Sequence, residues 1–585
     1  MPGGVSRIVL AMSMVVPAGA FAQGTAASPD AAQAALQQAD AAFHAGYAAM
    51  QAGKLEEARE DFAATVRLAP QLPEAHVALG AILAELDRPE EAVPELKKAL
   101  ELKPGDEAAE ANLATAHESI GKRLAAAGKL VEAETQVRAA LGALPAVSTT
   151  ATADASRANP VDPFLAQRVE ILDVLGSLLG QEKRWQEAES AFREALQANP
   201  QGEAAALPHM HLGVVLAEEK HYPEALAELT KAVEDAPGSA MAQLQLGRGL
   251  AAAGQDEEAV AHLEEALKLS PDLSGGALEL AMAEQRLGKQ AESIPLFEKT
   301  VEREPRNAQA LTNLGLALTE TGKAKDAVPY LQRALAETPD DPVVLEDLGV
   351  AELQQAHFDE AIAQFEKALV LDAANSQLHY DLGLAYKLKD RMDDAARELA
   401  KAASLDPTLP DPPYTLGILY MQMGRLEDAA TQLKAALALR RANGDGWALL
   451  GSVLKQMDRR DEAEVALRNA IALMPNQPGP HITLAAVLAE EGKHDEAAQE
   501  RKLAAGLSKT AVNRQRATLN TNAGNQLLQR GEIADAVEKY LDAIAADSGY
   551  AEAHAQLAVA YARQGRAAEA ATEREKAAAL DSEKQ

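Results

Sequence analysis

Histidines are the residues of this chain best suited to metal chemistry, because neutral imidazole is a common zinc ligand. The chain has 12 histidines, and His209, His211 and His221 form the best local cluster. Cysteine is absent, which excludes disulfides and thiolate metal sites. A glycine-rich phosphate loop, a nucleophile elbow and an HExxH motif are also absent, so no enzyme signature is found. Whether the histidines converge on one ion depends on the elements that carry them.

Those elements repeat with a period of 34 residues. A leucine beside glycine or alanine recurs at Leu212, Leu246, Leu280, Leu314, Leu348, Leu382, Leu416, Leu450 and Leu484. A small residue follows each pair, at Ala225, Ala259, Ser293, Ala327, Ala361, Ala395, Ala429, Ala463 and Ala497. A fixed period of this length is typical of solenoids, in which each repeat packs only against its neighbours. The period therefore directs the search for function toward a long surface.

Each period is predicted to contain two amphipathic helices. In residues 308–341, apolar side chains recur at helical spacing on both sides of a turn at 321–323. Leu314 and Leu331 fill the space beside small residues, where two helices must approach closely. Pro339 ends the second helix because proline cannot continue it.

This pattern resembles that of the tetratricopeptide repeat (TPR) family, in which a bulky residue, Leu-Gly, two alanines and a proline mark each copy. Fifteen copies start at Ala39, Pro73, Ala114, Val169, Ala206, Ala240, Ser274, Ala308, Pro342, Ser376, Pro410, Gly444, Pro478, Ala517 and Ala551, and they cover 510 of 585 residues. The resemblance implies an all-α fold, an α-solenoid of about fifteen helix-turn-helix repeats wound as a right-handed superhelix.

The repeat frame also answers the metal question. Six histidines share the position where the family has its bulky packing residue: His76, His117, His209, His379, His481 and His554. Equivalent positions of successive copies are one repeat apart, so their side chains cannot converge on one ion. We therefore predict that these histidines pack within their repeats, and we expect no metal and no cofactor.

The charges fit the same frame. The residue before the first alanine of each second helix is acidic in all fifteen copies, for example Glu258 and Asp326. A carboxylate in the first turn of a helix interacts favourably with the unpaired N–H groups there. The net charge of −32 argues against nucleic acid and against anionic membrane surfaces as partners.

One basic segment departs from this acidity. It contains Arg501, Lys502, Lys509, Arg514 and Arg516, and no acidic residue lies between 501 and 516. Two interpretations are open: a solvated helix face near an irregular joint, or a docking point for an acidic segment.

The N-terminus has the features of a secretory signal peptide. Arg7 precedes an apolar run at 8–16, and Ala20-Phe21-Ala22 offers a cleavage site before Gln23. The run is too short to span a bilayer, so we expect an exported protein, periplasmic or secreted, without stable membrane insertion. The predicted segments are the signal peptide 1–22, a flexible segment 23–38, three repeats in 39–145, a Ser/Thr/Ala/Pro linker 146–163, ten repeats in 164–511, and two repeats with a polar cap in 512–585.

In the TPR family, the first helices line a groove in which extended peptides lie. The resemblance places a polar stripe there: His211, Gln245, Glu279, Asn313, Asp347, Asp381 and Thr415. It also places an apolar stripe, interrupted by Arg248 and Arg286: Met210, Val214, Leu244, Met282, Leu316, Val350, Tyr380, Leu384, Tyr414, Ile418 and Met421. Polar groups can bind a peptide backbone while Met and Tyr provide adaptable apolar contact. The alternative is that some of these side chains only pack helix on helix.

The favoured function is therefore a non-catalytic scaffold that binds extended or unfolded segments of exported or cell-envelope proteins. An accessory of polysaccharide export, or a subunit associated with a glycosyltransferase, is the alternative. Aromatic platforms in the groove would indicate sugar, and aromatics are only 3% of the chain, which favours protein. A third possibility, the regulatory half of an enzyme, requires a catalytic domain on another chain.

Overall fold

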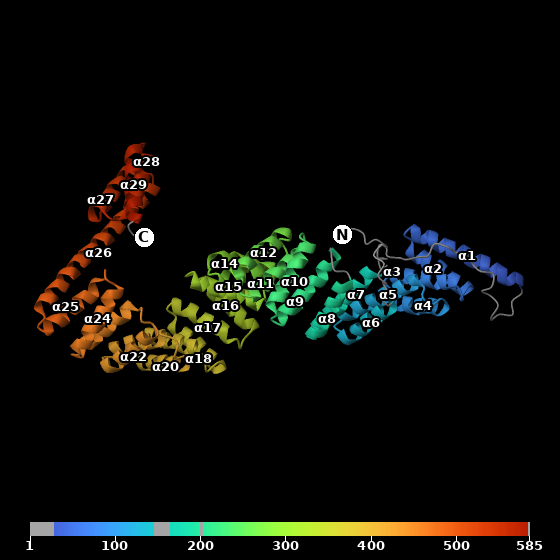
Figure 1. Ribbon diagram of the computed structural model, residues 1–585, viewed down its shortest axis with the longest axis horizontal. Coiled ribbons are helices and arrows are strands. Elements are labelled where there is room, and N and C mark those ends of the chain that lie inside the picture. Colours follow the sequence, from blue (N-terminus) through green and yellow to red (C-terminus); the bar gives the residue numbers. More distant parts are fainter. Residues whose placement is uncertain (1–28, 146–163, 199–202, 583–585) are drawn as a thin grey trace, which may run out of the picture. The chain divides into compact units, whose positions relative to one another are not determined.

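The computed structural model describes residues 29–145, 164–198 and 203–582. The predicted signal peptide 1–22 and the predicted linker 146–163 lie outside these residues. The described residues form 29 α-helices and one short 3-10 helix, without a β-strand. Successive helices pair as antiparallel hairpins, so the predicted all-α solenoid of helix-turn-helix repeats is confirmed (Figure 1).

Contacts between residues divide the chain into two compact units, residues 1–317 and 318–585, with the division inside α15. The sequence instead places its boundaries at 146–163 and 511/512. The helices before the division are α1 (Pro29–Gln51), α2 (Leu55–Leu68), α3 (Pro73–Glu85), α4 (Pro89–Leu102), α5 (Glu107–Ala126), α6 (Leu130–Ala143), α7 (Leu165–Gln181), α8 (Trp185–Ala198), α9 (Ala206–Glu218), α10 (Tyr222–Asp235), α11 (Ala240–Ala252), α12 (Asp256–Leu269), α13 (Gly276–Arg286) and α14 (Gln290–Arg303), with η1 (Glu203–Ala205) before α9.

The second unit begins within α15 (Ala308–Glu320). It continues as α16 (Ala324–Glu337), α17 (Pro342–Gln354), α18 (Phe358–Leu371), α19 (Ser376–Leu388), α20 (Met392–Leu405), α21 (Asp411–Gln422), α22 (Leu426–Leu439), α23 (Gly444–Gln456), α24 (Arg460–Leu473), α25 (Pro478–Glu490), α26 (His494–Gln529), α27 (Ile533–Ala546), α28 (Ala551–Arg563) and α29 (Ala567–Ser582). In both units, first helices of neighbouring repeats touch, as α9 touches α11 and α17 touches α19. First helices of neighbouring repeats therefore lie side by side at these places in each unit.

Close approach of the two helices in a repeat explains the glycine column. A Cβ atom added at Gly213 would lie 2.5 Å from Leu229 Cγ, and one at Gly349 would lie 2.5 Å from the Phe365 ring. Such distances are too short for a side chain, so glycine is required there. The small residue that recurs near the start of each second helix, for example Ala225, is completely buried. The sequence columns are therefore the interior contacts of each repeat.

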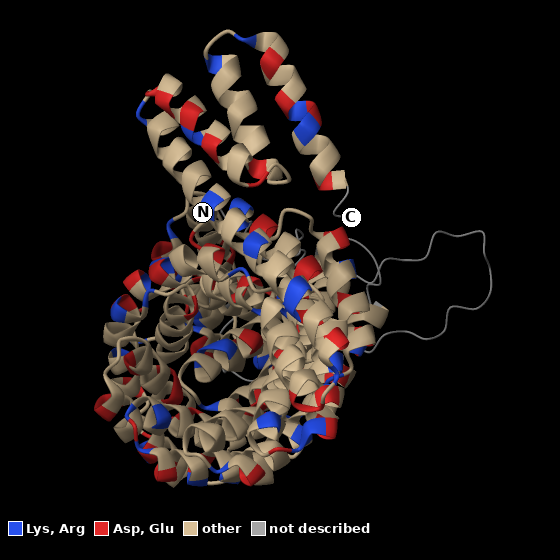
Figure 2. Ribbon diagram, turned by 90° about the vertical axis from the view of Figure 1, so that its left-hand side faces the viewer, with Lys and Arg blue, Asp and Glu red and all other residues tan. Residues whose placement is uncertain are grey.

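The acidic column has a second role besides the helix dipole. In several repeats the acid pairs with a basic residue three positions earlier in the turn, as Arg88 Nε does with Glu91 at 2.7 Å and Arg391 with Asp394. The Arg391 guanidinium also lies 4.2 Å from the centre of the Tyr386 ring, a cation–π contact. Figure 2 shows acidic and basic residues interspersed along the helices.

Three segments show how local sequence sets helix length. Residues 107–113, which lie between the second and third copies, extend α5 to 20 residues. Helix α1 begins at Pro29, so the last ten residues of the predicted flexible segment 23–38 are helical. The sequence places a boundary between two segments after residue 511, but no turn forms there, because α26 runs unbroken for 36 residues. Lys509 stands where proline ends other second helices, and no proline or left-handed glycine stops the helix.

Candidate functional site

The repeated histidines tie the two helices of each repeat together. The Nδ1 atom of His76 lies 2.6 Å from Glu95 on the second helix, and its Nε2 lies 3.0 Å from the Pro70 carbonyl oxygen. The same 19-residue spacing joins His117 to Gln136, His209 to Glu228, His379 to Glu398, His481 to Glu500 and His554 to Glu573, at 2.5–2.7 Å. Gln243 and His262 form the pair with the residue types exchanged, at 2.8 Å. Each of these side chains therefore joins the two helices of its own repeat, as the packing interpretation predicts.

The pKa values of His76, His117 and Glu228 are shifted by burial and by the partner of each group. The hydrogen bond to Glu95 raises the pKa of His76, whereas burial lowers the pKa of His117, whose partner amide carries no charge. The hydrogen bond from His209 lowers the pKa of Glu228 to about 2. Because the folded carboxyl then titrates below its unfolded value, this bond contributes stability above about pH 4.5 that is lost as the pH falls toward 2.

The first-helix face of the first unit contains two adjoining hollows. One, of about 680 Å³, is lined mainly by apolar atoms of α7, α8 and α9, with Trp185 and Phe192 among them. The other, of about 570 Å³, lies between α9, α10, α11 and α13. Val214 and Glu218 line both hollows. The two hollows therefore adjoin at α9, and one is mainly apolar whereas the other is charged.

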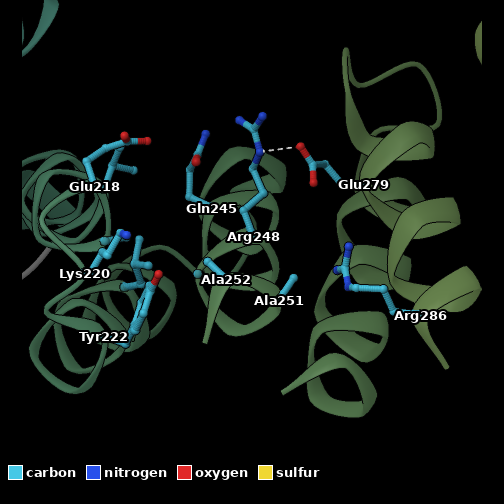
Figure 3. A pocket seen from close by; sticks show the side chains of 13 residues that line it. Glu218, Lys220, Tyr222, Gln245, Arg248, Ala251, Ala252, Glu279 and Arg286 are labelled. Atoms are coloured by element: carbon cyan, nitrogen blue, oxygen red, sulfur yellow. Dashed lines mark hydrogen bonds and ion pairs between the residues drawn. The ribbon is translucent and has the colours of Figure 1, made fainter. Parts of the chain in front are cut away.

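Ion pairs between neighbouring repeats lie at the charged hollow. Figure 3 shows Gln245 and Arg248 on the middle helix, Lys220 and Tyr222 on one side, and Glu279 and Arg286 on the other. Arg248 Nε donates to Glu279 at 2.8 Å, and Arg286 Nε donates to Asp256 at 2.8 Å. Each guanidinium has five N–H donors, so these bonds fix both side chains and leave donors for a ligand.

The predicted stripes divide into accessible and buried members. Val214, Gln245, Arg248, Glu279 and Arg286 line the charged hollow, and His211 lines the apolar one. Most of the remainder are partly exposed on first helices: Met282, Asn313, Leu316, Asp347, Val350, Tyr380, Asp381, Leu384, Tyr414, Ile418 and Met421.

Three predicted groove residues require correction. Met210 and Leu244 are only 6% and 2% exposed and belong to the core formed by α9–α13. Thr415 is buried too, with its hydroxyl 3.3 Å from the Tyr380 hydroxyl. All three side chains therefore pack between helices instead of facing a ligand, although Tyr380 and Tyr414 occupy the repeat position of Met210 and Leu244 and are partly exposed.

The polar stripe also joins neighbouring repeats. His211 Nδ1 lies 2.8 Å from Asp173 on the preceding first helix, and Gln285 donates to the Asn313 carbonyl oxygen at 3.3 Å. Together with the Arg248–Glu279 pair, these bonds cross from one first helix to the next. The stripe therefore fixes the spacing of repeats as well as lining the face.

Three carboxyl groups lie on the first-helix face of the second unit without a cation among their hydrogen-bond partners. Burial and the neighbouring acids raise the pKa of Glu346 and of Asp347 to about 7 each, and burial raises that of Asp381 to about 6. The Oδ2 atom of Asp347 is buried and has no hydrogen-bond partner among the described residues. Ionising Asp347 therefore works against folding.

Asp347→Asn is expected to stabilise the second unit by about 1–3 kcal/mol at pH 8, because it removes that buried charge. The wild-type carboxyl has a raised folded pKa, so its penalty develops as the pH rises from about 4 to 7 and remains above that. The gain should consequently shrink toward zero near pH 4. Urea unfolding followed by circular dichroism at the two pH values measures this, and an equal gain at both would contradict it.

The sequence analysis missed Trp185, Lys220 and Tyr222, which line the hollows from the second helices and the turns. A signal was available, because Trp185 and Tyr222 are the first residues of α8 and α10 and occupy the same repeat position in consecutive copies. Trp185 is also one of only 2 tryptophans in the chain. The prediction considered first helices alone and therefore overlooked them. No helix among the described ranges is both long enough and apolar enough to cross a membrane.

Helical hairpins of this period, stacked through glycine–leucine contacts, define a TPR-type solenoid. Sequence models described as tetratricopeptide repeat match residues 45–107, 174–240, 212–274, 278–342 and 346–410, and further TPR models match 389–453, 444–477, 478–500 and 524–565. The chain belongs to the tetratricopeptide repeat family. A search of curated proteins found no match.

Several solved structures are similar to parts of the chain. The MamA protein is 26% identical over 29% of this chain and 93% of its own, with a TM-score of 0.28. YrrB, described as a TPR protein with an unusual peptide-binding site, is 25% identical over 31% of this chain and 92% of its own, with a TM-score of 0.28. A tetratricopeptide repeat protein from Parabacteroides merdae is 18% identical over 46% of this chain and 98% of its own, with a TM-score of 0.33.

Proposed function

We propose that this protein is a non-catalytic scaffold that binds extended polypeptide segments on the first-helix face of its first unit. The observation that supports this most directly is the pair of adjoining hollows beside Val214 and Glu218. Alternate side chains of an extended chain are about 6.5–7 Å apart on one side. Such a chain can therefore place one side chain against Trp185 and a later one in the charged hollow.

The chemistry of the two hollows suits a peptide. Trp185 and Phe192 offer a large apolar contact, of the kind that dominates protein–protein binding energy. Gln245 can donate to and accept from a peptide backbone, while Arg248 and Arg286 offer donors to carbonyl or carboxylate oxygens. TPR proteins typically act as scaffolds without catalysis, which agrees with the absence of enzyme motifs in the sequence.

The partners we propose are exported or cell-envelope proteins, because residues 1–22 have the sequence features of a secretory signal peptide. In the second unit, the partly exposed residues Tyr380, Leu384, Tyr414 and Ile418 are proposed to extend the same kind of face. Asp381 lies on the same helix as Tyr380 and Leu384, so that face combines apolar contact with hydrogen-bond acceptors. An exported scaffold of this kind would act outside the cytoplasm.

The test is site-specific photocrosslinking to a random-sequence peptide library whose members are capped at both ends. A photoreactive amino acid replaces Gln245, which lines the charged hollow, or Glu264, which is exposed on the second helix α12. The Gln245 position is expected to capture peptides and the Glu264 position to capture few. Excess unlabelled peptide should abolish the capture.

Equal capture at the two positions would move the binding surface away from the hollows. A glycan accessory remains the second candidate, because Trp185 offers an aromatic face on which a sugar ring can stack. Adding neutral oligosaccharides to the same reaction separates the two functions. Loss of peptide capture in their presence would favour the glycan function over the one proposed.

A further inference from the structure

Helix α26 is largely exposed in its middle third. Ala497 near its start packs in the core of α22–α25, and Ala517 and Gly524 near its end pack against α27 and α28. Between these anchors, most residues from 501 to 516 are exposed, with Ala504 the only buried one. In Figure 1 the helix is a single rod that joins α25 to α27. A regular pair of repeats would have a turn here and would cover this surface.

The exposed side of this rod has a heptad pattern. Alternating steps of three and four residues, which place side chains on one face of a helix, give the positions Lys502, Ala505, Lys509, Val512, Arg516 and Leu519. All six are exposed, including Val512 at 62% and Leu519 at 64%. The first position of each heptad is basic and the fourth is apolar. We call these six residues the α26 seam.

The cations of the seam have no acid of their own. Lys502, Lys509 and Arg516 form no ion pair with any residue that the structure describes, although the chain has 88 acidic residues. Arg514, on another side of the same helix, shows the contrast: it pairs with Asp547 at 2.5 Å and lies over the Tyr550 ring. That arginine anchors α26 to the last repeats, whereas the seam cations point away from the fold.

We propose that the α26 seam is a docking site for an acidic amphipathic helix of another protein. Heptad spacing matches a helix, since an antiparallel or parallel partner presents its own side chains at the same period. The seam spans residues 502–519, about 26 Å of helix axis. Glutamate or aspartate on the partner would pair with the three cations, and its apolar residues would cover Ala505, Val512 and Leu519.

Other occupants fit the seam less well. A second α26 would bring like charges together, because the core positions of the seam are lysine and arginine. Nucleic acid does not account for the regular apolar positions, and the surrounding net charge of −32 opposes it. A membrane surface requires a wide apolar face flanked by cations, whereas here cations alternate with apolar residues on one narrow stripe.

The experiment uses the full chain and a synthetic helix with leucine and glutamate at alternating core positions. A second synthetic helix with lysine in place of glutamate is the matched control ligand. Fluorescence anisotropy should show binding of the acidic helix alone, weakened by salt. Lys502→Glu, Lys509→Glu and Arg516→Glu together should weaken that binding about tenfold or more.

A second variant controls for the change in net charge. Lys367, Lys401 and Arg530 are exposed elsewhere in the second unit, and reversing these three should leave the affinity within about twofold. Circular dichroism checks that both variants stay helical. The proposal is overturned if the two synthetic helices bind equally or not at all, or if both variants lose affinity for the acidic helix to the same extent. Binding of the wild-type chain to anionic lipid vesicles or duplex DNA, lost in the seam variant, would also overturn it, as would self-association through the seam.

Discussion

Phe365→Ala is expected to destabilise the repeat formed by α17 and α18 by about 3–5 kcal/mol. The Phe365 ring is completely buried and occupies the space left by Gly349, where no other side chain fits. Truncation leaves a cavity that the neighbouring helices cannot close without breaking their own contacts. This is the largest effect on stability expected from any single truncation in that repeat.

The effect should also be local, because repeats of a solenoid touch only their neighbours. Hydrogen exchange is expected to accelerate in α17–α20 and to change little in α3–α6 of the first unit. Val370→Ala is the matched control on the same helix: its side chain is 84% exposed, so the loss should stay below about 0.5 kcal/mol. Uniform acceleration over both units would show one cooperative core and would contradict this picture.

The repeat architecture was predictable because its determinants lie close together in sequence. Gly213 and Leu229 lie on two helices joined by one short turn. The same pair recurs in copy after copy, so a contact between the two helices appears in the sequence as residue types that repeat every 34 residues. The histidines were predictable for the same reason, since the 19-residue spacing from His76 to Glu95 stays inside one repeat. Local pairing of this kind requires no knowledge of how repeats stack.

The binding face was less predictable because it depends on contacts between repeats. Met210 and Leu244 share a repeat position with the partly exposed Tyr380 and Tyr414, yet both are buried in the core between helices. Trp185 reaches the face from a second helix, which the family pattern does not assign to the groove. The hollows lie between consecutive copies. The residue pattern within one copy does not predict how far apart two copies pack.

The course of α26 shows a different gap in the sequence argument. The predicted boundary after residue 511 was based on a shift in the spacing of the repeats. Such a shift does not by itself end a helix, and α26 continues through it. Proline and a left-handed glycine are common ends of a helix, and residues 507–516 contain neither proline nor glycine. The absence of stop signals was the better guide.

Trp185→Ala is expected to weaken peptide binding about thirtyfold, the loss typical of a central aromatic anchor at about 2 kcal/mol. The indole forms a wall of the apolar hollow beside Gly180, whose added Cβ would lie 3.8 Å from the ring. Removing it takes away the largest apolar contact available to a ligand. Trp185→Phe keeps an aromatic wall and should recover most of the affinity.

The most direct test of the central claim is the affinity of the peptides recovered at Gln245, measured by isothermal titration calorimetry. It compares the wild-type chain, Trp185→Ala and Val131→Ala, the last being an exposed apolar position on the second helix α6. With unchanged helicity in all three, we expect strong loss in Trp185→Ala and wild-type affinity in Val131→Ala. Wild-type affinity in Trp185→Ala, or equal loss in both variants, would contradict a polypeptide-binding face at these hollows.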